Sequence, residues 1–155
     1  FELGCSLLNS EGVRQDHLYM NRRTNEAGQV TGVDISGSKI GGDVKDTMVL
    51  FPDPMGATGG SISEAMSIYR DIEGGADAKL ISVNLIITPE YIRRIRKDHP
   101  DARIYALRLD RGMSSHDVLQ EALGASSDQE TGLNDVQYIV PGAGGLGEIL
   151  NNSFI

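Results

Sequence analysis

The sequence predicts an α/β fold, with a mainly parallel sheet flanked by helices and a projecting β-hairpin. Apolar runs of strand length alternate with segments of helical spacing along the chain. The runs lie at 47–51, 79–87, 103–109 and 138–140, and the helical segments lie at 62–71, 89–98 and 118–123. Two glycine-rich loops, 52–61 and 141–147, directly follow expected strands, and ligands of parallel sheets bind at that end of the strands.

The composition is that of a globular protein of one domain, which we expect to span residues 1–155. Hydrophobic residues are 39% and charged residues 23%, and no apolar run approaches the ~20 residues of a membrane helix. The net charge of −8 disfavours a nucleic-acid-binding surface, which is normally basic. A single cysteine, Cys5, cannot form an internal disulfide, so we expect a reducing, cytoplasmic compartment. Because the chain begins at Phe1 in an apolar segment, we expect further sequence upstream.

The elements of the first third follow from local patterns. Residues 3–9 are apolar and predict a helix. Residues 17–23 and 30–36 flank a turn-rich connection, which predicts a hairpin arm over about 16–36. The continuous apolar run 47–51 is typical of a central parallel strand covered on both faces.

The helices follow from spacing and end signals. Within 62–71, four side chains share one face, namely Ile62, Ala65, Met66 and Tyr69. Pro89 suits the first turn of the helix expected at 89–98. A short final helix is expected at 148–152.

The loop 52–61 has the design of a phosphate cradle. Asp53 follows an apolar strand, and the run Ala-Thr-Gly-Gly-Ser at 57–61 opens a helix. Backbone N–H groups at a helix N-terminus favour an anion, and the hydroxyls of Thr58 and Ser61 can add hydrogen bonds. The Asp53 carboxylate can accept hydrogen bonds from a pair of ribose hydroxyls. A tight turn in which Ser61 caps the helix is the structural alternative.

Residues 53–61 read Asp-Pro-Met-Gly-Ala-Thr-Gly-Gly-Ser and closely resemble the phosphoribosyl pyrophosphate (PRPP) loop of uracil phosphoribosyltransferases, D-P-M-L-A-T-G-G-S. Eight of nine positions agree, and Gly56 replaces leucine. The single aspartate followed by Pro-Met is specific to this branch of the type I phosphoribosyltransferases, so the resemblance implies that fold. It also implies Asp53 as the catalytic residue and PRPP contacts at Asp53, Ala57, Thr58, Gly59, Gly60 and Ser61.

Residues 132–149 resemble the uracil-binding segment of the same family, G-L-N-x-x-G-Y-I-V-P-G-L-G-D-A-G-D-R. The core Tyr-Ile-Val-Pro-Gly-x-Gly is kept at 138–144. Uracil offers alternating carbonyl and N–H groups, which backbone atoms can match. The resemblance implies uracil contacts at Tyr138, Ile139, Gly144 and Gly145. The member is divergent, because Gly145, Glu148 and Ile149 stand where the family has Asp, Asp and Arg.

Elsewhere the resemblance is looser. Arg14, His17 and Arg22 match the family's R-x-x-H-x-x-x-x-R strand, which leads into a dimer-forming β-arm. The resemblance implies that Arg14 and Arg22 meet the diphosphate of PRPP, and exposed strand charge is the alternative. An insertion at about 111–131, absent from the family, is expected to be a lid, a dimer contact or neither. The family's N-terminal arm is absent, which implies a chain that is incomplete at its N-terminus.

The implied activity is the synthesis of UMP and diphosphate from uracil and PRPP, a transferase step of pyrimidine salvage. The resemblance implies Mg²⁺ as cofactor, held through the diphosphate rather than by metal-ligating side chains, and a homodimer or higher homo-oligomer. Two alternatives stay open on the residues alone. One is a nucleotide- or PRPP-sensing protein of the same fold without turnover. The other is a phosphoribosyltransferase for another base.

Overall fold

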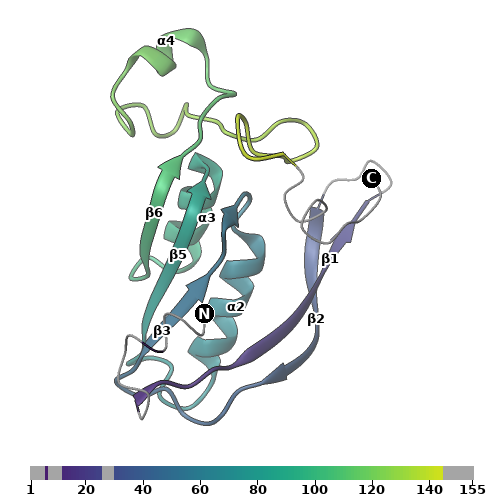
Figure 1. The fold of residues 1–155 in the computed structure, drawn as a ribbon, viewed down its shortest axis with the longest axis vertical. Helices are drawn as coiled ribbons and strands as arrows, with labels where there is room; N and C mark the ends of the chain where they lie inside the picture. Colours follow the sequence, from purple (N-terminus) through teal and green to yellow (C-terminus); the bar gives the residue numbers. More distant parts are fainter. Residues whose placement is uncertain (1–5, 7–11, 26–29, 145–155) are drawn as a thin grey trace.

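A computed structural model of the chain describes residues 6, 12–25 and 30–144 (Figure 1). The helix expected at 148–152 and Gly145 lie outside these residues, as does the helix expected at 3–9 except for Ser6, which is helical. Within the described ranges, no helix is long and apolar enough to cross a membrane.

A parallel sheet forms the centre of the molecule, as predicted. The central strand is β5 (Lys79–Ile87), which pairs with β6 (Arg103–Leu109) on one side. On its other side lie β3 (Met48–Pro52) and the two-residue β4 (Met55–Gly56). The expectation that 47–51 is a central strand is therefore wrong: β3 pairs with β5 alone among the described residues.

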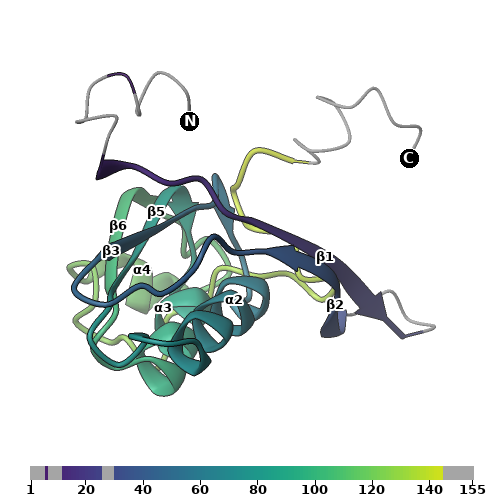
Figure 2. The same ribbon diagram turned by 90° about the horizontal axis from the view of Figure 1, so that it is seen from below.

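Two helices cover one face of this sheet (Figure 2). Helix α2 (Gly60–Asp71) follows the 52–61 loop, and α3 (Pro89–Asp98) follows β5. Thr88 caps α3 by accepting a hydrogen bond from the backbone N–H of Tyr91, and Pro89 fits the first turn as expected. The core between the layers is made of Val44, Phe51, Ile62, Ala65, Met66, Tyr69, Ala78, Leu80, Ile87, Tyr91 and Ile95.

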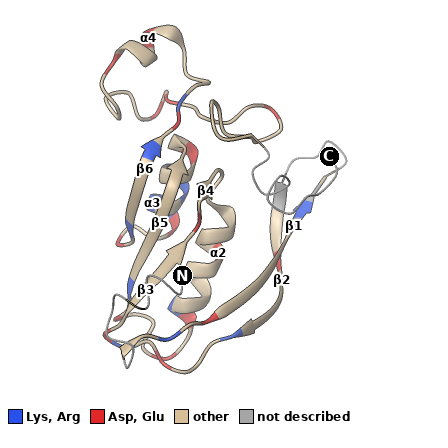
Figure 3. Ribbon diagram, viewed as in Figure 1, with Lys and Arg blue, Asp and Glu red and all other residues tan. Residues whose placement is uncertain are grey.

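The opposite face of the sheet is apolar and exposed in the part of the chain that the structure describes. Its outward side chains are Met48, Leu50, Val83, Leu85, Tyr105 and Leu107, and Leu107 is 84% exposed. The strands are uncharged along their middle, and their charged residues lie at the ends (Figure 3). Among residues 12–25 and 30–144, helices thus flank the sheet on one side, although parallel sheets are usually covered on both faces.

The predicted hairpin arm is present and extends beyond the sheet (Figures 1 and 2). Strands β1 (His17–Thr24) and β2 (Val30–Lys39) pair antiparallel, with irregular register after Tyr19 and Arg23. The arm is joined to α2 at its base, where the Tyr69 hydroxyl donates to Asp16 Oδ2 at 2.9 Å.

The segment after β6 is mostly loop. The helix expected at 118–123 is α4 (His116–Gln120), which Ser115 caps through its side chain. The strand expected at 138–140 is wrong in extent, because only an isolated bridge joins Ile139 to Leu133. Asn134 Oδ1 accepts hydrogen bonds from the backbone N–H groups of Val136 and Tyr138, which closes the chain into a turn instead.

Candidate functional site

The 52–61 loop and the start of the 132–144 segment approach each other around Thr88, at the C-terminal edge of the sheet. Thr88, which directly follows β5, donates its hydroxyl hydrogen to the carbonyl of Ala57 at 2.6 Å. On its other side, a Cβ atom added to Gly132 would lie 3.1 Å from the Thr88 Cβ. Thr88 therefore lies between the 52–61 loop and the segment that carries 132–144.

The 52–61 loop is bound to β5 along its length. Its backbone bonds are Asp53 N–H to Val83 O, Ile86 N–H to Pro54 O, and Thr88 N–H to Gly56 O. Asp53 Oδ1 also accepts the backbone N–H of Met55 at 3.0 Å. These bonds explain the short strand β4, and they fix Asp53 at the end of β3.

The N-terminus of α2 has no side-chain cap and follows a glycine with positive φ. The residue before the helix is Gly59, at φ 77° and without a side-chain cap, so the predicted alternative in which Ser61 caps the helix is wrong. A Cβ on Gly59 would lie 3.2 Å from the Arg94 Cβ and 3.3 Å from the Tyr91 carbonyl oxygen, so this position needs glycine. No acidic residue occupies the described first turn, which leaves the positive end of the helix uncompensated.

A chain of buried polar side chains lies behind this loop. The Tyr91 hydroxyl is 2.6 Å from Ser82 Oγ, and Ser82 Oγ donates to Asn84 Oδ1 at 2.6 Å. Asn84 Nδ2 then donates to the Asp53 carbonyl at 2.7 Å. Burial raises the pKa of Tyr91 despite its bonds to Ser82 and Asn84, so the phenol stays protonated.

Sequence reasoning missed these residues. The signal was available, since Ser82 and Asn84 interrupt the apolar run of β5, and both are almost fully buried. A buried polar side chain needs a hydrogen-bond partner, and here that partner is the loop.

The 132–144 segment, referred to as the second loop, is hydrogen-bonded to residues that follow β6. Gly112 N–H donates to the Val140 carbonyl, and Val140 N–H donates to the Gly132 carbonyl, both at 2.8 Å. Glu90 accepts the Gly132 N–H through both carboxylate oxygens, at 3.0 and 3.1 Å. Asp110 Oδ2 accepts the Gly142 N–H at 2.7 Å.

The predicted uracil contacts differ in exposure. The Tyr138 side chain is 47% exposed, whereas Ile139 is buried at 8%. Gly144 has a φ of 64°, and a Cβ atom there would meet nothing within 4 Å. The segment 138–144 is thus partly buried at Ile139 and open at Gly144, and Val140 ties it to Gly132, which lies against Thr88.

The structure does not bring Arg14 to the loops. Its guanidinium pairs with Asp16 at 2.9 Å and donates to the carbonyls of Gly42 and Asp43. Asp16 in turn contacts Tyr69, near the end of α2 opposite to the 57–61 run. Arg22 lies in β1, opposite Val33 of the arm. Their contact with a diphosphate stays a prediction.

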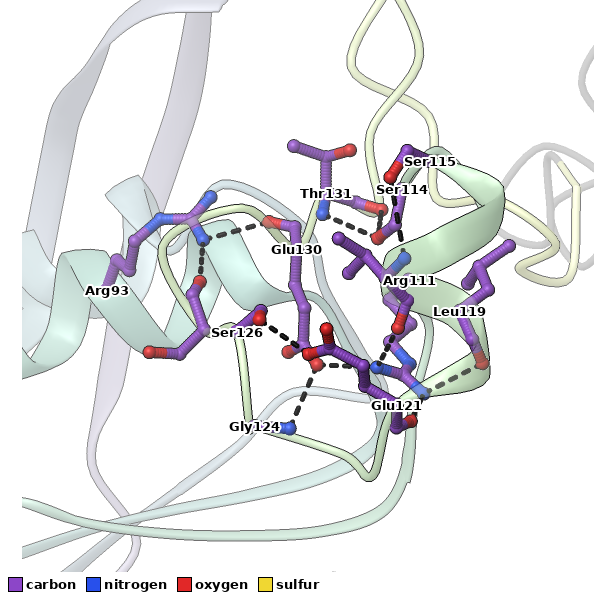
Figure 4. Close-up of polar contacts among 12 residues, drawn as sticks. Arg93, Arg111, Ser114, Ser115, Leu119, Glu121, Gly124, Ser126, Glu130 and Thr131 are labelled. Atoms are coloured by element: carbon purple, nitrogen blue, oxygen red, sulfur yellow. Dashed lines mark hydrogen bonds and ion pairs between the residues drawn. The ribbon is translucent and has the colours of Figure 1, made fainter.

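The 111–131 segment is folded around a buried ion pair (Figure 4). Arg111 Nη1 lies 2.6 Å from Glu130 Oε1, with side chains only 11% and 2% exposed. Arg111 also donates to the carbonyls of Val118, Leu119 and Glu121. From α3, Arg93 donates to the carbonyls of Ser127 and Glu130 at 2.7 and 2.9 Å, which fastens the segment to that helix.

Comparison with known proteins identifies the family to which the chain belongs. The model of a family described as uracil phosphoribosyltransferase matches residues 17–130. The chain belongs to the uracil phosphoribosyltransferase family. The matched region contains the arm, the 52–61 loop and the sheet, and it ends just before the 132–144 loop.

Individual members of the uracil phosphoribosyltransferase family are moderately similar. A uracil phosphoribosyltransferase of Caldanaerobacter subterraneus subsp. tengcongensis is 37% identical over 91 residues, which are 59% of this chain and 42% of that protein. One from Acholeplasma laidlawii is 35% identical over 113 residues, 73% of this chain and 43% of that protein. The chain thus spans less than half the length of these relatives.

A solved structure shares the fold. A protein from Aquifex aeolicus superposes with a TM-score of 0.61 and 28% sequence identity, over 86% of this chain and 50% of that chain. The mixed α/β arrangement with its parallel sheet and hairpin is consistent with the type I phosphoribosyltransferase fold.

Proposed function

We propose that the protein transfers the phosphoribosyl group of PRPP to uracil, forming UMP and diphosphate in pyrimidine salvage. The observation that carries the proposal is the 53–61 loop, whose sequence resembles the family's PRPP loop and which runs from the end of β3 into the N-terminus of α2. Membership of the uracil phosphoribosyltransferase family supports it.

The first loop would hold the phosphoribosyl group. The 5′-phosphate would bind the backbone N–H groups and hydroxyls of the 57–61 run at the positive end of α2. The Asp53 carboxylate would accept hydrogen bonds from the ribose hydroxyls. Bonds from Asn84 to the Asp53 carbonyl and from the Asp53 N–H to Val83 fix this backbone, which supports the proposed role by limiting how far the carboxylate can move.

The reaction breaks the bond from C1′ to the diphosphate oxygen and forms a bond from C1′ to uracil N1, which loses its proton. Positive charge develops on the ribose as the diphosphate leaves, so catalysis consists mainly of positioning and charge stabilisation. Backbone groups at Ile139, Gly144 and Gly145, with Tyr138 beside them, would orient uracil so that N1 faces C1′.

Magnesium would accompany the substrate. The described residues contain no group of three or more His, Cys, Asp or Glu side chains that could hold a metal ion. We propose that the ion is bound mainly through the oxygens of the diphosphate, whose charge it would neutralise. Arg22 is proposed as a further partner of the diphosphate, in a cytoplasmic homodimer or higher oligomer formed through the β1–β2 arm, whereas the pairing of Arg14 with Asp16 keeps that guanidinium away from the loops of its own chain.

The test is a titration of the protein with PRPP and Mg²⁺ by calorimetry, followed by labelled uracil. We expect binding and UMP formation, and Asp53→Asn is expected to weaken PRPP binding about tenfold through the lost charged acceptor. Asp77→Asn, an exposed aspartate in the turn before β5, is the control and should bind as wild type does.

The outcomes separate the candidate functions. Binding without UMP formation would favour a PRPP sensor, or an enzyme for another base that a panel of purines and pyrimidines would identify. Absence of PRPP binding, with Asp53→Asn equal to wild type, would contradict the phosphoribosyltransferase proposal altogether.

A further inference from the structure

A buried carboxylate lies under the proposed base-binding loop. Asp110 follows the last residue of β6, and its side chain is only 3% exposed. A charge in the protein interior is costly unless it is paired and hydrogen-bonded. Arg108 supplies the pair, with Nε 2.5 Å from Asp110 Oδ1 and Nη2 2.6 Å from Oδ2.

The same carboxylate binds the loop. Asp110 Oδ2 accepts the Gly142 N–H at 2.7 Å, and two residues away Gly112 N–H donates to the Val140 carbonyl at 2.8 Å. The chain is thereby held on both sides of Pro141. Gly142 has a φ of 58°, and a Cβ atom there would lie 2.2 Å from the Ile139 carbonyl oxygen, so the turn is tight.

The placement of this turn matters because of what flanks it. Ile139 and Gly144 are the residues whose backbone is proposed to bind uracil, and Gly142 lies between them. A backbone N–H or C=O group cannot move independently of the main chain. Its position is therefore set by the contacts that hold the main chain in place. At this turn the described holding groups are the Gly112 amide, the Gly132 carbonyl and the Asp110 carboxylate, and Arg108 Nη2 also donates to the Gly142 carbonyl at 3.4 Å.

We propose that Asp110 is a positioning residue for the base, which holds the 139–144 backbone in the geometry that binds uracil, with Arg108 orienting its carboxylate. The proposal rests on the proposed function. Arg108 hydrogen bonds lower the pKa of Asp110, burial opposes them, and the Gly142 N–H lowers it further, so the acceptor stays ionised.

The test compares Asp110→Ala with Asp110→Asn. Alanine removes the acceptor of the Gly142 N–H, whereas asparagine keeps an oxygen and loses the charge. We expect the KM for uracil to rise about tenfold in Asp110→Ala and less in Asp110→Asn, while the KM and Kd for PRPP stay within about twofold of wild type. Binding of PRPP also reports that each variant is folded.

Asp101→Asn is the matched control. Asp101 pairs with Arg70 next to the other end of β6, so the substitution removes the carboxylate of another Arg–Asp pair, 65% exposed and away from the loop. Neither KM should change. Amide hydrogen exchange at Gly142 gives a second readout that needs no activity, and it should be faster in Asp110→Ala than in wild type.

The outcomes are distinguishable. A wild-type protein that makes no UMP overturns the proposed function, and this inference with it. An active wild type, with an unchanged uracil KM in Asp110→Ala or equal increases in both KM values, overturns only the role of Asp110. Unchanged Gly142 exchange in that variant also overturns it.

Discussion

The Tyr91 ring occupies the space beneath the first loop into which a side chain at position 56 would extend. A Cβ atom on Gly56 would lie 2.8 Å from Tyr91 Cδ2 and 3.0 Å from Ile87 Cγ2, and Tyr91 is fully buried. The loop sequence that this chain resembles has leucine at position 56. The tyrosine ring therefore occupies room that a larger residue at position 56 would need, so the side chains allowed at the two positions are sterically linked.

We expect Gly56→Leu to destabilise the protein by about 1–3 kcal/mol, because overpacking a dense core forces neighbours to shift. Tyr91→Ala should be destabilising through the cavity that it leaves. The double variant should be more stable than the sum of the two losses predicts, since leucine fills part of the vacated volume. Urea unfolding of all four proteins measures this coupling.

Gly12→Ala is the control for this cycle. A Cβ atom at Gly12 would meet nothing within 4 Å, so its stability should change by less than about 0.5 kcal/mol. Additive losses in the Gly56 and Tyr91 variants would show that the two residues do not share the space.

At the scale of elements, local patterns predicted well wherever the controlling residues are neighbours in the sequence. The loop 53–61 and helix α3 were predictable because glycine, hydroxyl and proline positions carry the information themselves. The hairpin arm was predictable in the same way. The contact of Asn84 with Asp53 was not, because it depends on the register of β5 against β3, which no local pattern contains.

The 111–131 segment shows the same limit. Its length predicted an insertion, but its fold depends on Glu130, which reaches back across the segment to Arg111. Glu130 Oε1 also accepts the Gly124 N–H at 2.9 Å. Two charges that are nearly buried thus organise a loop that has only one short helix of its own.

We expect Glu130→Gln to loosen this segment without unfolding the sheet, because it leaves the Arg111 guanidinium buried without its charge partner. Breaking a buried pair costs about 3–5 kcal/mol, so the Gly124 and Thr131 amides should exchange about a hundredfold faster or more. Hydrogen exchange measured by NMR checks this.

An exposed ion pair provides the comparison for Glu130→Gln. Asp34→Asn removes the partner of Arg23 in the arm, where the two side chains are 57% and 62% exposed, and should cost less than about 1 kcal/mol. Equal exchange rates in Glu130→Gln and wild type would mean that backbone bonds alone hold the segment.

At the scale of the molecule, the sequence predicted the α/β class and misjudged the position of one strand. The run 47–51 is apolar throughout, which is typical of a central strand, yet Met48 and Leu50 are exposed at 69% and 50%. The hydrophobicity of a strand predicts that its faces are suited to burial. It does not predict which other element of the structure covers them. The outward apolar face of β3, β5 and β6 is therefore a property that only the assembled sheet displays.

Acid stability is a property of the whole molecule, because three carboxylates tie separate parts together. Asp16 joins the arm to α2, Asp98 accepts hydrogen bonds from Ser63 and Arg94, and Asp110 holds the second loop. Burial raises the pKa of Asp16, but bonds from Arg14, Tyr69 and Gly41 outweigh it, so the pKa is lowered. The Ser63 and Arg94 bonds lower that of Asp98, as the Arg108 bonds do for Asp110.

A carboxyl whose pKa is lower in the folded protein stabilises that protein when it is ionised. This stability is fully present well above the ordinary pKa of 3.8 and is lost as the pH falls through the lower folded values. We therefore expect the urea midpoint to be nearly constant from pH 7 to about pH 5 and to fall steeply below pH 4. Asp16→Asn should lower the midpoint at pH 7 and flatten the acid limb, because one of the three titrating groups is gone. An acid limb of unchanged slope in Asp16→Asn would show that the junction between the arm and α2 does not contribute to acid unfolding.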